Sequence, residues 1–246
     1  MSSCGLLLWD IDGTLLAGGD PDHIEGLRHE LSIVAGCEVT FEGITLGGNI
    51  ERRISAEALA LAGVHPVDIA RLSAIAIERL GHRYETTVQD RRDRLLPGVV
   101  DTLSLTGSVV AAGVLTGGAR RVARAKLAAA GLAELLPFGA YGDEADERHE
   151  LVEHACAEAI ERGVRWCGCR AHVVLIGDTP ADISAARSSG AVVIAVATGR
   201  LSADDLAAHR PDALLDDLSD PGAVLDAVHR VRCEPCTAPG VRSPDR

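Results

Sequence analysis

Residues 6–15 read LLLWDIDGTL, an apolar run that stops at two aspartates and a glycine. A short continuous apolar run is typical of a strand in a parallel sheet that is covered on both faces. Similar runs predict further strands at residues 109–115, 172–176, 191–196 and 213–215. Helical patterns separate these runs, at about residues 119–131, 146–163, 181–189, 202–208 and 221–231. The alternation predicts an α/β fold with a doubly wound parallel sheet and right-handed crossovers.

Residues 18–95 interrupt this alternation, because they contain no convincing strand pattern. Helical patterning recurs within them at residues 22–35, 51–62 and 67–85. The segment is too long for a plain crossover, so it predicts an inserted helical module, or cap. We therefore expect a core of residues 1–17 and 96–232, a helical cap of residues 18–95, and a disordered tail at residues 233–246.

The composition is that of an ordinary soluble globular protein, with 47% hydrophobic and 24% charged residues among 246. The net charge of −12 argues against nucleic acid or an anionic membrane as the main partner, because both are bound through basic surfaces. No secretory signal and no apolar run of membrane-spanning length are recognisable. We expect a cytoplasmic monomer or homodimer that acts on a small molecule.

The seven cysteines include two closely spaced pairs, Cys167 with Cys169 and Cys233 with Cys236. Such pairs can supply four zinc ligands, but neither lies in a recognisable zinc-binding pattern. Reduced thiols are the ordinary state of cysteines in the cytoplasm. We therefore favour free thiols over a zinc site or a disulfide.

Polar clusters follow three of the predicted strands, at the carboxyl ends where ligands bind in open α/β sheets. Each cluster alone could be an ordinary turn, loop or helix cap, but the three in this order indicate a site. Several carboxylates without histidine or cysteine suit Mg²⁺. A hydroxyl and two glycines at a helix start suit a phosphate, because backbone N–H groups are free there. The candidate residues are Asp10, Asp12, Thr116, Gly117, Gly118, Asp178 and Asp182.

Residues 10–15 (DIDGTL), Thr116 and residues 177–182 (GDTPAD) resemble the first, second and fourth motifs of the haloacid dehalogenase superfamily of hydrolases. The position of the helical insertion resembles that of the cap in the phosphoglycolate phosphatase-like members. The resemblance covers about residues 5–230. It implies a Mg²⁺-dependent phosphatase that hydrolyses the phosphomonoester of a small metabolite through an aspartyl-phosphate.

The same resemblance implies a role for each acidic residue. Asp10 matches the nucleophile that attacks phosphorus, and Asp12 matches the general acid and base. Asp10, the backbone carbonyl of Asp12 and Asp178 match the Mg²⁺ ligands. Asp182 matches the second acidic position of the fourth motif, which completes the metal site by orienting metal-bound water or the basic residue.

Phosphoryl oxygens are expected to bind Thr116 and the backbone N–H groups of Gly117 and Gly118. The family also places a lysine or arginine ahead of the fourth motif, and Arg148 in the segment DEADER (143–148) matches it best. A surface salt bridge is the alternative for Arg148, but without it the phosphate site lacks a side-chain cation. The chain's one lysine, Lys126, lies in a helical pattern, and we expect it on a solvated face.

The presence of Asp12 favours phosphoryl transfer over halide displacement. Halide displacement needs no acid for the leaving group, and the dehalogenases lack this second aspartate. A phosphonatase would need a lysine in the cap, and residues 18–95 contain none. A sugar phosphomutase stays open, since it uses the same two aspartates. A catalytically idle phosphometabolite-binding protein is the other alternative.

Substrate choice is expected to depend on the cap segment at residues 47–53, GGNIERR. Relatives often carry a Thr-Asp pair where this chain has Ile50 and Glu51. Arg52 is our candidate for contact with an anionic part of the substrate, with an ordinary surface arginine as the alternative.

Overall fold

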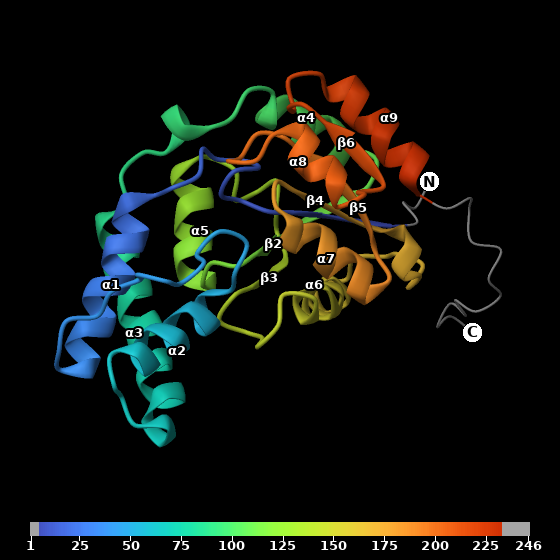
Figure 1. The fold of residues 1–246 in the computed structure, drawn as a ribbon. Coiled ribbons are helices and arrows are strands. Elements are labelled where there is room, and N and C mark those ends of the chain that lie inside the picture. The colour runs from blue at the N-terminus through green and yellow to red at the C-terminus, as the bar shows by residue number, and fades with distance from the viewer. Residues whose placement is uncertain (1–4, 233–246) are drawn as a thin grey trace, which may run out of the picture.

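The computed structural model describes residues 5–232, in which an α/β core carries a helical insertion (Figure 1). The described residues form a six-stranded parallel sheet in the order β3-β2-β1-β4-β5-β6, with β1 near its centre. The strands are β1 (Leu6–Trp9), β2 (Ala111–Thr116), β3 (Gly139–Tyr141), β4 (Val173–Gly177), β5 (Val192–Val196) and β6 (Ala213–Leu215). This confirms the predicted parallel α/β fold.

Helices cover both faces of the sheet. The first face packs against α4 (Val99–Gly107), α5 (Arg120–Ala129) and α9 (Pro221–Val231), and the second against α6 (Glu150–Glu161), α7 (Pro180–Ser189) and α8 (Ala203–Ala208). Successive residues of a strand point to opposite faces, so Leu7 and Trp9 join the first apolar cluster and Leu6 and Leu8 join the second. Because all four are fully buried, β1 is apolar at every position and not at alternate ones.

Two core elements, β3 and α4, lie outside the sequence prediction. Strand β3 has only three residues, Gly-Ala-Tyr, too few to give an apolar run. Its place is set by parallel pairing with β2, in which Gly139 lies opposite Val114. Helix α4 begins directly after Gly98, whose φ of 76° is left-handed, and packs against α9. Both elements owe their positions to contacts with segments distant in the sequence.

The insertion between β1 and β2 contains α1 (Pro21–Ala35), α2 (Glu51–Leu61) and α3 (Pro66–Thr87), which lie together beside the sheet (Figure 1). These bounds agree within two residues with the three predicted helices. The helices share an apolar cluster that Ala119 and Val122, at the start of α5, also join. The limits of the cap at residues 18 and 95 stay a prediction, and the predicted tail at 233–246 lies outside the described residues. None of the helices described is both long and apolar enough to cross a membrane.

Candidate active site

The strand order brings the three predicted motifs to one edge of the sheet. Asp10 directly follows β1, Thr116 ends β2, and Asp178 directly follows β4. Strand β1 lies between β2 and β4, and all three strands are parallel. The motifs, which are about 60 to 110 residues apart in sequence, therefore meet at the carboxyl edge, as the sequence analysis predicts.

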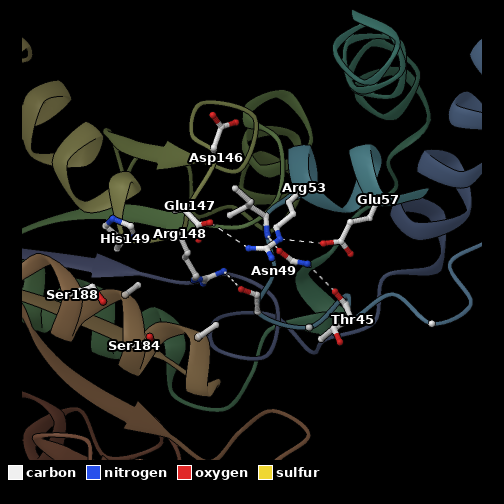
Figure 2. Close-up of a pocket in the computed structure, with 16 residues that line it drawn as sticks. Thr45, Asn49, Arg53, Glu57, Asp146, Glu147, Arg148, His149, Ser184 and Ser188 are labelled. Atoms are coloured by element: carbon white, nitrogen blue, oxygen red, sulfur yellow. Dashed lines mark hydrogen bonds and ion pairs between the residues drawn. The ribbon is translucent and has the colours of Figure 1, made fainter. Parts of the chain in front are cut away.

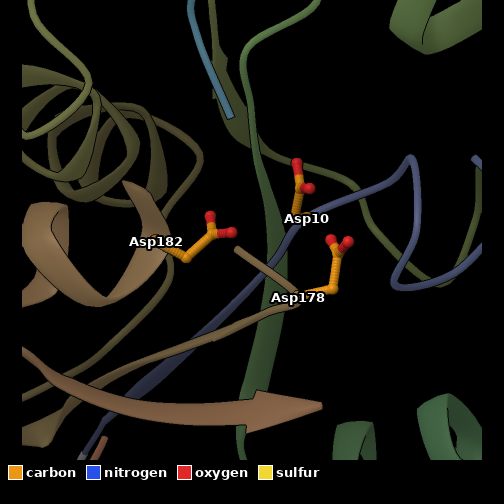
Figure 3. A group of neighbouring side chains, drawn as sticks. All are labelled: Asp10, Asp178 and Asp182. Carbon is orange, nitrogen blue, oxygen red and sulfur yellow. The ribbon is translucent and has the colours of Figure 1, made fainter. Parts of the chain in front are cut away.

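Three buried carboxylates face one another at this edge (Figure 3). Asp10, Asp178 and Asp182 each offer an oxygen, and these oxygens lie within 4.8 Å of one another. Burial raises the pKa of Asp10 well above its ordinary value, with Asp182 and Asp178 adding to the rise while Arg148 opposes it. Burial, followed by the charge of Asp182, raises the pKa of Asp178 to about 7. Carboxylates held this close favour a bound cation.

The Asp178 carboxylate is fixed in a cradle that only glycines can form. A Cβ atom on Gly13 would lie 2.3 Å from Asp178 Oδ2, and one on Gly199 would lie 1.7 Å from it. Gly13 also has a φ of +98°, which side chains rarely adopt. Thr14 Oγ1 donates a hydrogen bond of 3.2 Å to Asp178 Oδ1. The fixed carboxylate beside Asp10 gives an all-oxygen donor set, and this set fits Mg²⁺.

Asp182 uses both of its carboxylate oxygens within the protein. Its Oδ2 accepts hydrogen bonds from the N–H group (3.1 Å) and the hydroxyl (2.6 Å) of Thr179, which caps α7. Its Oδ1 accepts a hydrogen bond of 2.5 Å from Arg148 Nη2. Of the two roles predicted for Asp182, this arrangement favours orienting the basic residue over orienting metal-bound water.

Arg148 lies buried beside the predicted nucleophile, with Nη2 3.2 Å from Asp10 Oδ1. Burial lowers the pKa of its guanidinium, but Asp182 and Asp10 outweigh burial and raise the pKa above its ordinary value. Its Nη1 donates a hydrogen bond of 3.2 Å to the carbonyl of Gly48 in the cap. Its Nε finds no hydrogen-bond partner among the residues that the structure describes. A permanently charged donor thus contacts the acidic cluster through its Nη2 atom.

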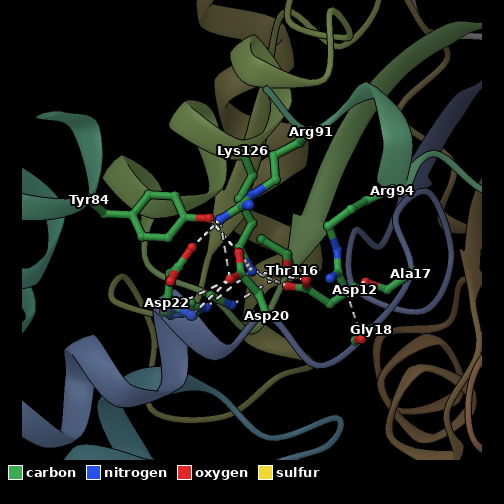
Figure 4. A network of polar contacts seen from close by, with 12 residues as sticks. Asp12, Ala17, Gly18, Asp20, Asp22, Tyr84, Arg91, Arg94, Thr116 and Lys126 are labelled. Carbon is green, nitrogen blue, oxygen red and sulfur yellow. Dashed lines mark hydrogen bonds and ion pairs between the residues drawn. The ribbon is translucent and has the colours of Figure 1, made fainter. Parts of the chain in front are cut away.

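The expectation that Lys126 lies on a solvated face is wrong. The residue is 1% exposed, and its Nζ lies 2.9 Å and 2.7 Å from the two carboxylate oxygens of Asp12 (Figure 4). Helix α5 packs on the sheet and also against α3 of the cap, so it has two covered sides. The spacing along α5 is the signal that could have predicted this burial. Lys126 lies four residues after Val122 and three after Ala123, so it shares the side of the helix on which both are buried.

The start of α2 is docked on the predicted phosphate loop. The Glu51 N–H group donates a hydrogen bond of 2.8 Å to the Gly117 carbonyl. The buried Glu51 carboxylate accepts a hydrogen bond of 2.6 Å from the Ala119 N–H group, just before α5 begins. Thr116 is buried, and its Oγ1 lies 3.4 Å from the N–H group of Gly118. Glu51, which stands where relatives often have aspartate, thus joins cap to core, a role that sequence reasoning missed.

A cavity of about 450 Å³ opens beside Arg148, between the cap and the helices α6 and α7 (Figure 2). Its lining is mostly polar and includes Thr45, Asn49, Arg53, Arg148, His149 and Ser184. The Arg52 guanidinium does not line this cavity; it is half exposed and lies 3.3 Å from Asp146. Contact between Arg52 and a substrate therefore stays a prediction.

The structure describes one of the two closely spaced cysteine pairs, Cys167 with Cys169. Cys167 Sγ lies 2.9 Å from His172 Nδ1, just before β4, and no disulfide joins the cysteines between residues 5 and 232. Cys233 and Cys236 lie outside the described residues. Within the described part of the chain, the three aspartates are the one cluster with the geometry of a metal site. The role of the thiols stays a prediction.

Comparisons with known proteins agree with this geometry. A family of HAD-hydrolase-like proteins matches residues 149–221, which contain the fourth motif. A phosphoglycolate phosphatase from a plasmid of Cupriavidus necator is 28% identical over 229 residues, which cover 90% of this chain and 93% of that protein. These matches confirm the resemblance to haloacid dehalogenase-like hydrolases of the phosphoglycolate phosphatase type.

Solved structures share the fold over nearly the whole chain. A predicted phosphoglycolate phosphatase from Haemophilus somnus matches with a TM-score of 0.60 and 21% identity, covering 91% of this chain and 99% of that one. A β-phosphoglucomutase from Clostridium difficile matches with a TM-score of 0.64 and 13% identity, covering 94% and 98%. At these identities the likeness concerns the fold alone.

Proposed function

We propose that this haloacid dehalogenase-like hydrolase is a Mg²⁺-dependent phosphatase that hydrolyses a small phosphomonoester through an aspartyl-phosphate on Asp10. One observation carries the proposal: Asp10 belongs to a buried group of three carboxylates and also lies 3.2 Å from the buried guanidinium of Arg148. A carboxylate with a cation site on one side and a fixed arginine on the other suits attack on a phosphoryl group.

In the first step, a carboxylate oxygen of Asp10 attacks phosphorus and the bond to the substrate's alkoxide oxygen breaks. Asp12 gives a proton to that leaving oxygen. Thr116, the Gly117 N–H group and Arg148 bind the phosphoryl oxygens and stabilise the charge that develops on them. Mg²⁺, held by Asp10, Asp178 and the Asp12 carbonyl, would neutralise negative charge on the nucleophile and the phosphoryl group when bound.

In the second step, water replaces Asp10 on phosphorus. Asp12, now a carboxylate, takes a proton from the attacking water, and the bond between phosphorus and Asp10 breaks to release phosphate. The cap covers this edge of the sheet through the contact of Glu51 with Gly117, so it limits the access of bulk water. Opening of that contact would admit the substrate and release the products.

A sugar phosphomutase is the second candidate, because the same two aspartates can pass the phosphoryl group to a sugar hydroxyl. The fold does not separate the two reactions, since solved structures described as phosphoglycolate phosphatase and as β-phosphoglucomutase both match it. The acceptor of the phosphoryl group on Asp10 distinguishes them. An idle binding protein would need neither a nucleophile nor a general acid, and this chain has aspartates at both positions, Asp10 and Asp12.

The function is tested with a panel of phosphomonoesters, including hexose phosphates, assayed for released phosphate with Mg²⁺ and with a chelator. We expect release from at least one small ester, and a loss of about 10³-fold on chelation, because a bound cation contributes several kcal/mol to such reactions. Isomerisation of a hexose phosphate without release would favour the mutase. No reaction with any ester would favour the idle binder.

Metal binding has a readout that needs no substrate. Burial and Asp182 raise the pKa of Asp178 to about 7, so the metal-free fold holds an unfavourable charge at about pH 8. Mg²⁺ at about 100 times its Kd should stabilise the protein by about 2.7 kcal/mol and raise Tm by about 5–10 °C. Asp178→Asn should raise the metal-free Tm and remove most of the Mg²⁺ response. Equal Mg²⁺ responses in the parent and the variant, measured by calorimetry, would contradict the assigned site.

A further inference from the structure

We propose that Lys126 is a positioning residue for Asp12, which it holds at the reaction centre and connects to the cap. The proposal rests on the proposed function, because it gives Asp12 the role of general acid and base. Lys126 Nζ lies 2.9 Å and 2.7 Å from the two oxygens of Asp12, so one ammonium group bridges both oxygens of the carboxylate (Figure 4). Held at both oxygens, the carboxylate has little freedom to rotate; when Asp12 carries the proton for the leaving group, one oxygen bears that proton and the ammonium group still holds the other.

The third N–H donor of Lys126 is directed at the cap. Its Nζ lies 3.1 Å from His23 Nδ1 in α1, and His23 Nε2 lies 3.1 Å from Glu51 Oε2 in α2. An ammonium group only donates, so Nδ1 must accept and Nε2 must carry the proton that it donates to Glu51. The same Glu51 oxygen accepts the N–H group of Ala119. A continuous chain of hydrogen bonds thus runs from Asp12 through both docked cap helices and back to α5.

The neighbouring charges show that Asp12 is the main partner of Lys126. The other nearby carboxylate, Asp20, lies farther away, with its Oδ2 3.8 Å from Nζ. Asp20 accepts a hydrogen bond from Tyr84 and lies 3.5 Å from Arg91, so it has partners of its own. Burial raises the pKa of Asp20, but Tyr84, Lys126 and Arg91 together hold it below its ordinary value.

Position matters for Asp12 because its side chain has to reach the leaving oxygen. Its side chain is 33% exposed, whereas that of Lys126 is only 2% exposed, so the pair presents the carboxylate outward and keeps the ammonium group inside. A displacement of about 1 Å in a catalytic group can cost about 10²-fold in rate. Without Lys126, nothing else described in the structure donates a side-chain hydrogen bond to Asp12.

The test compares Lys126→Met with Lys126→Arg on two substrates: an alkyl phosphomonoester, whose leaving group needs a proton, and p-nitrophenyl phosphate, whose leaving group does not. Because kcat/KM reports the step that forms the aspartyl-phosphate, we expect Lys126→Met to lower it about 10²-fold for the alkyl ester and less than about 5-fold for the aryl ester. Lys126→Arg should recover part of the loss. Arg91→Met removes a cation from the same network without contact to Asp12 and should affect both esters alike.

A double-mutant cycle with Asp12→Asn completes the test. If Lys126 acts through Asp12, Lys126→Met should cost no further activity in the Asp12→Asn background. Equal losses on both esters, or additive losses in the cycle, would assign Lys126 to stability alone and overturn the proposal. Failure of the parent to hydrolyse either ester would overturn the proposed function instead, and with it the role of Asp12.

Discussion

Asp10→Asn should lower kcat/KM for phosphomonoester hydrolysis by at least about 10⁴-fold, a loss typical of removing a nucleophile. The amide lacks the anionic oxygen that attacks phosphorus and is a poorer ligand for a cation. Acid-quenched parent protein should carry one phosphoryl group when its intact mass is measured during turnover, and the variant should carry none. Stability should be kept, because burial and the neighbouring carboxylates already raise the pKa of Asp10 and make its charge unfavourable.

A matched control separates this effect from a general loss of charge. Asp22→Asn makes the same chemical change at an exposed carboxylate at the start of α1, which pairs with Arg91 and not with the acidic cluster. Its kcat/KM should stay within about 2-fold of the parent, as for surface substitutions in general. Phosphate release by Asp10→Asn within about 10-fold of the parent would show that another group attacks phosphorus.

The sequence predicts the parts of this fold that repeat a local pattern. The apolar runs at β1, β2, β4 and β5 and the helical patterns of α1, α2 and α3 are local signals, and the structure places these elements within about two residues of the prediction, whereas α6 begins four residues later than predicted. Strand β3 could not be predicted in this way, because its three residues owe their conformation to pairing with β2. The helical insertion is recognisable from the length of chain between β1 and β2.

Within the site, motif spacing predicts which aspartates come together. It does not predict that Lys126 pairs with Asp12. Asp10, Asp178 and Asp182 follow strand ends, and the topology alone brings them together. The pairing of Lys126 with Asp12 depends on the cap, since α5 packs against α3 and Lys126 reaches His23. Such contacts between cap and core join residues about 100 positions apart, so a local sequence pattern cannot predict them.

Arg148 should matter for both catalysis and folding, because it is the ion-pair partner of both Asp10 and Asp182, and residues 5–232 offer these two carboxylates no other. It lies 2.5 Å from Asp182 and 3.2 Å from Asp10, and all three residues are buried. Removing one member of a buried ion pair leaves the others uncompensated, at a cost of about 3–5 kcal/mol. The same guanidinium can donate to a phosphoryl oxygen, and among the described residues its Nε has no hydrogen-bond partner.

Arg148→Met should therefore lower kcat/KM by about 10³-fold, in the range of an arginine that stabilises phosphoryl-transfer charge, and should also lower the free energy of unfolding. Adding Asp182→Asn to this variant removes a buried charge, so stability should recover while activity stays low. Arg71→Met, which removes an exposed arginine that pairs with Asp68 in α3 and does not line this cavity, should change neither quantity strongly. Urea unfolding and phosphate release, measured on all three variants, separate the contribution of Arg148 to catalysis from its contribution to stability. Recovery of activity together with stability would mean that Arg148 only holds the fold and does not contact the phosphoryl group.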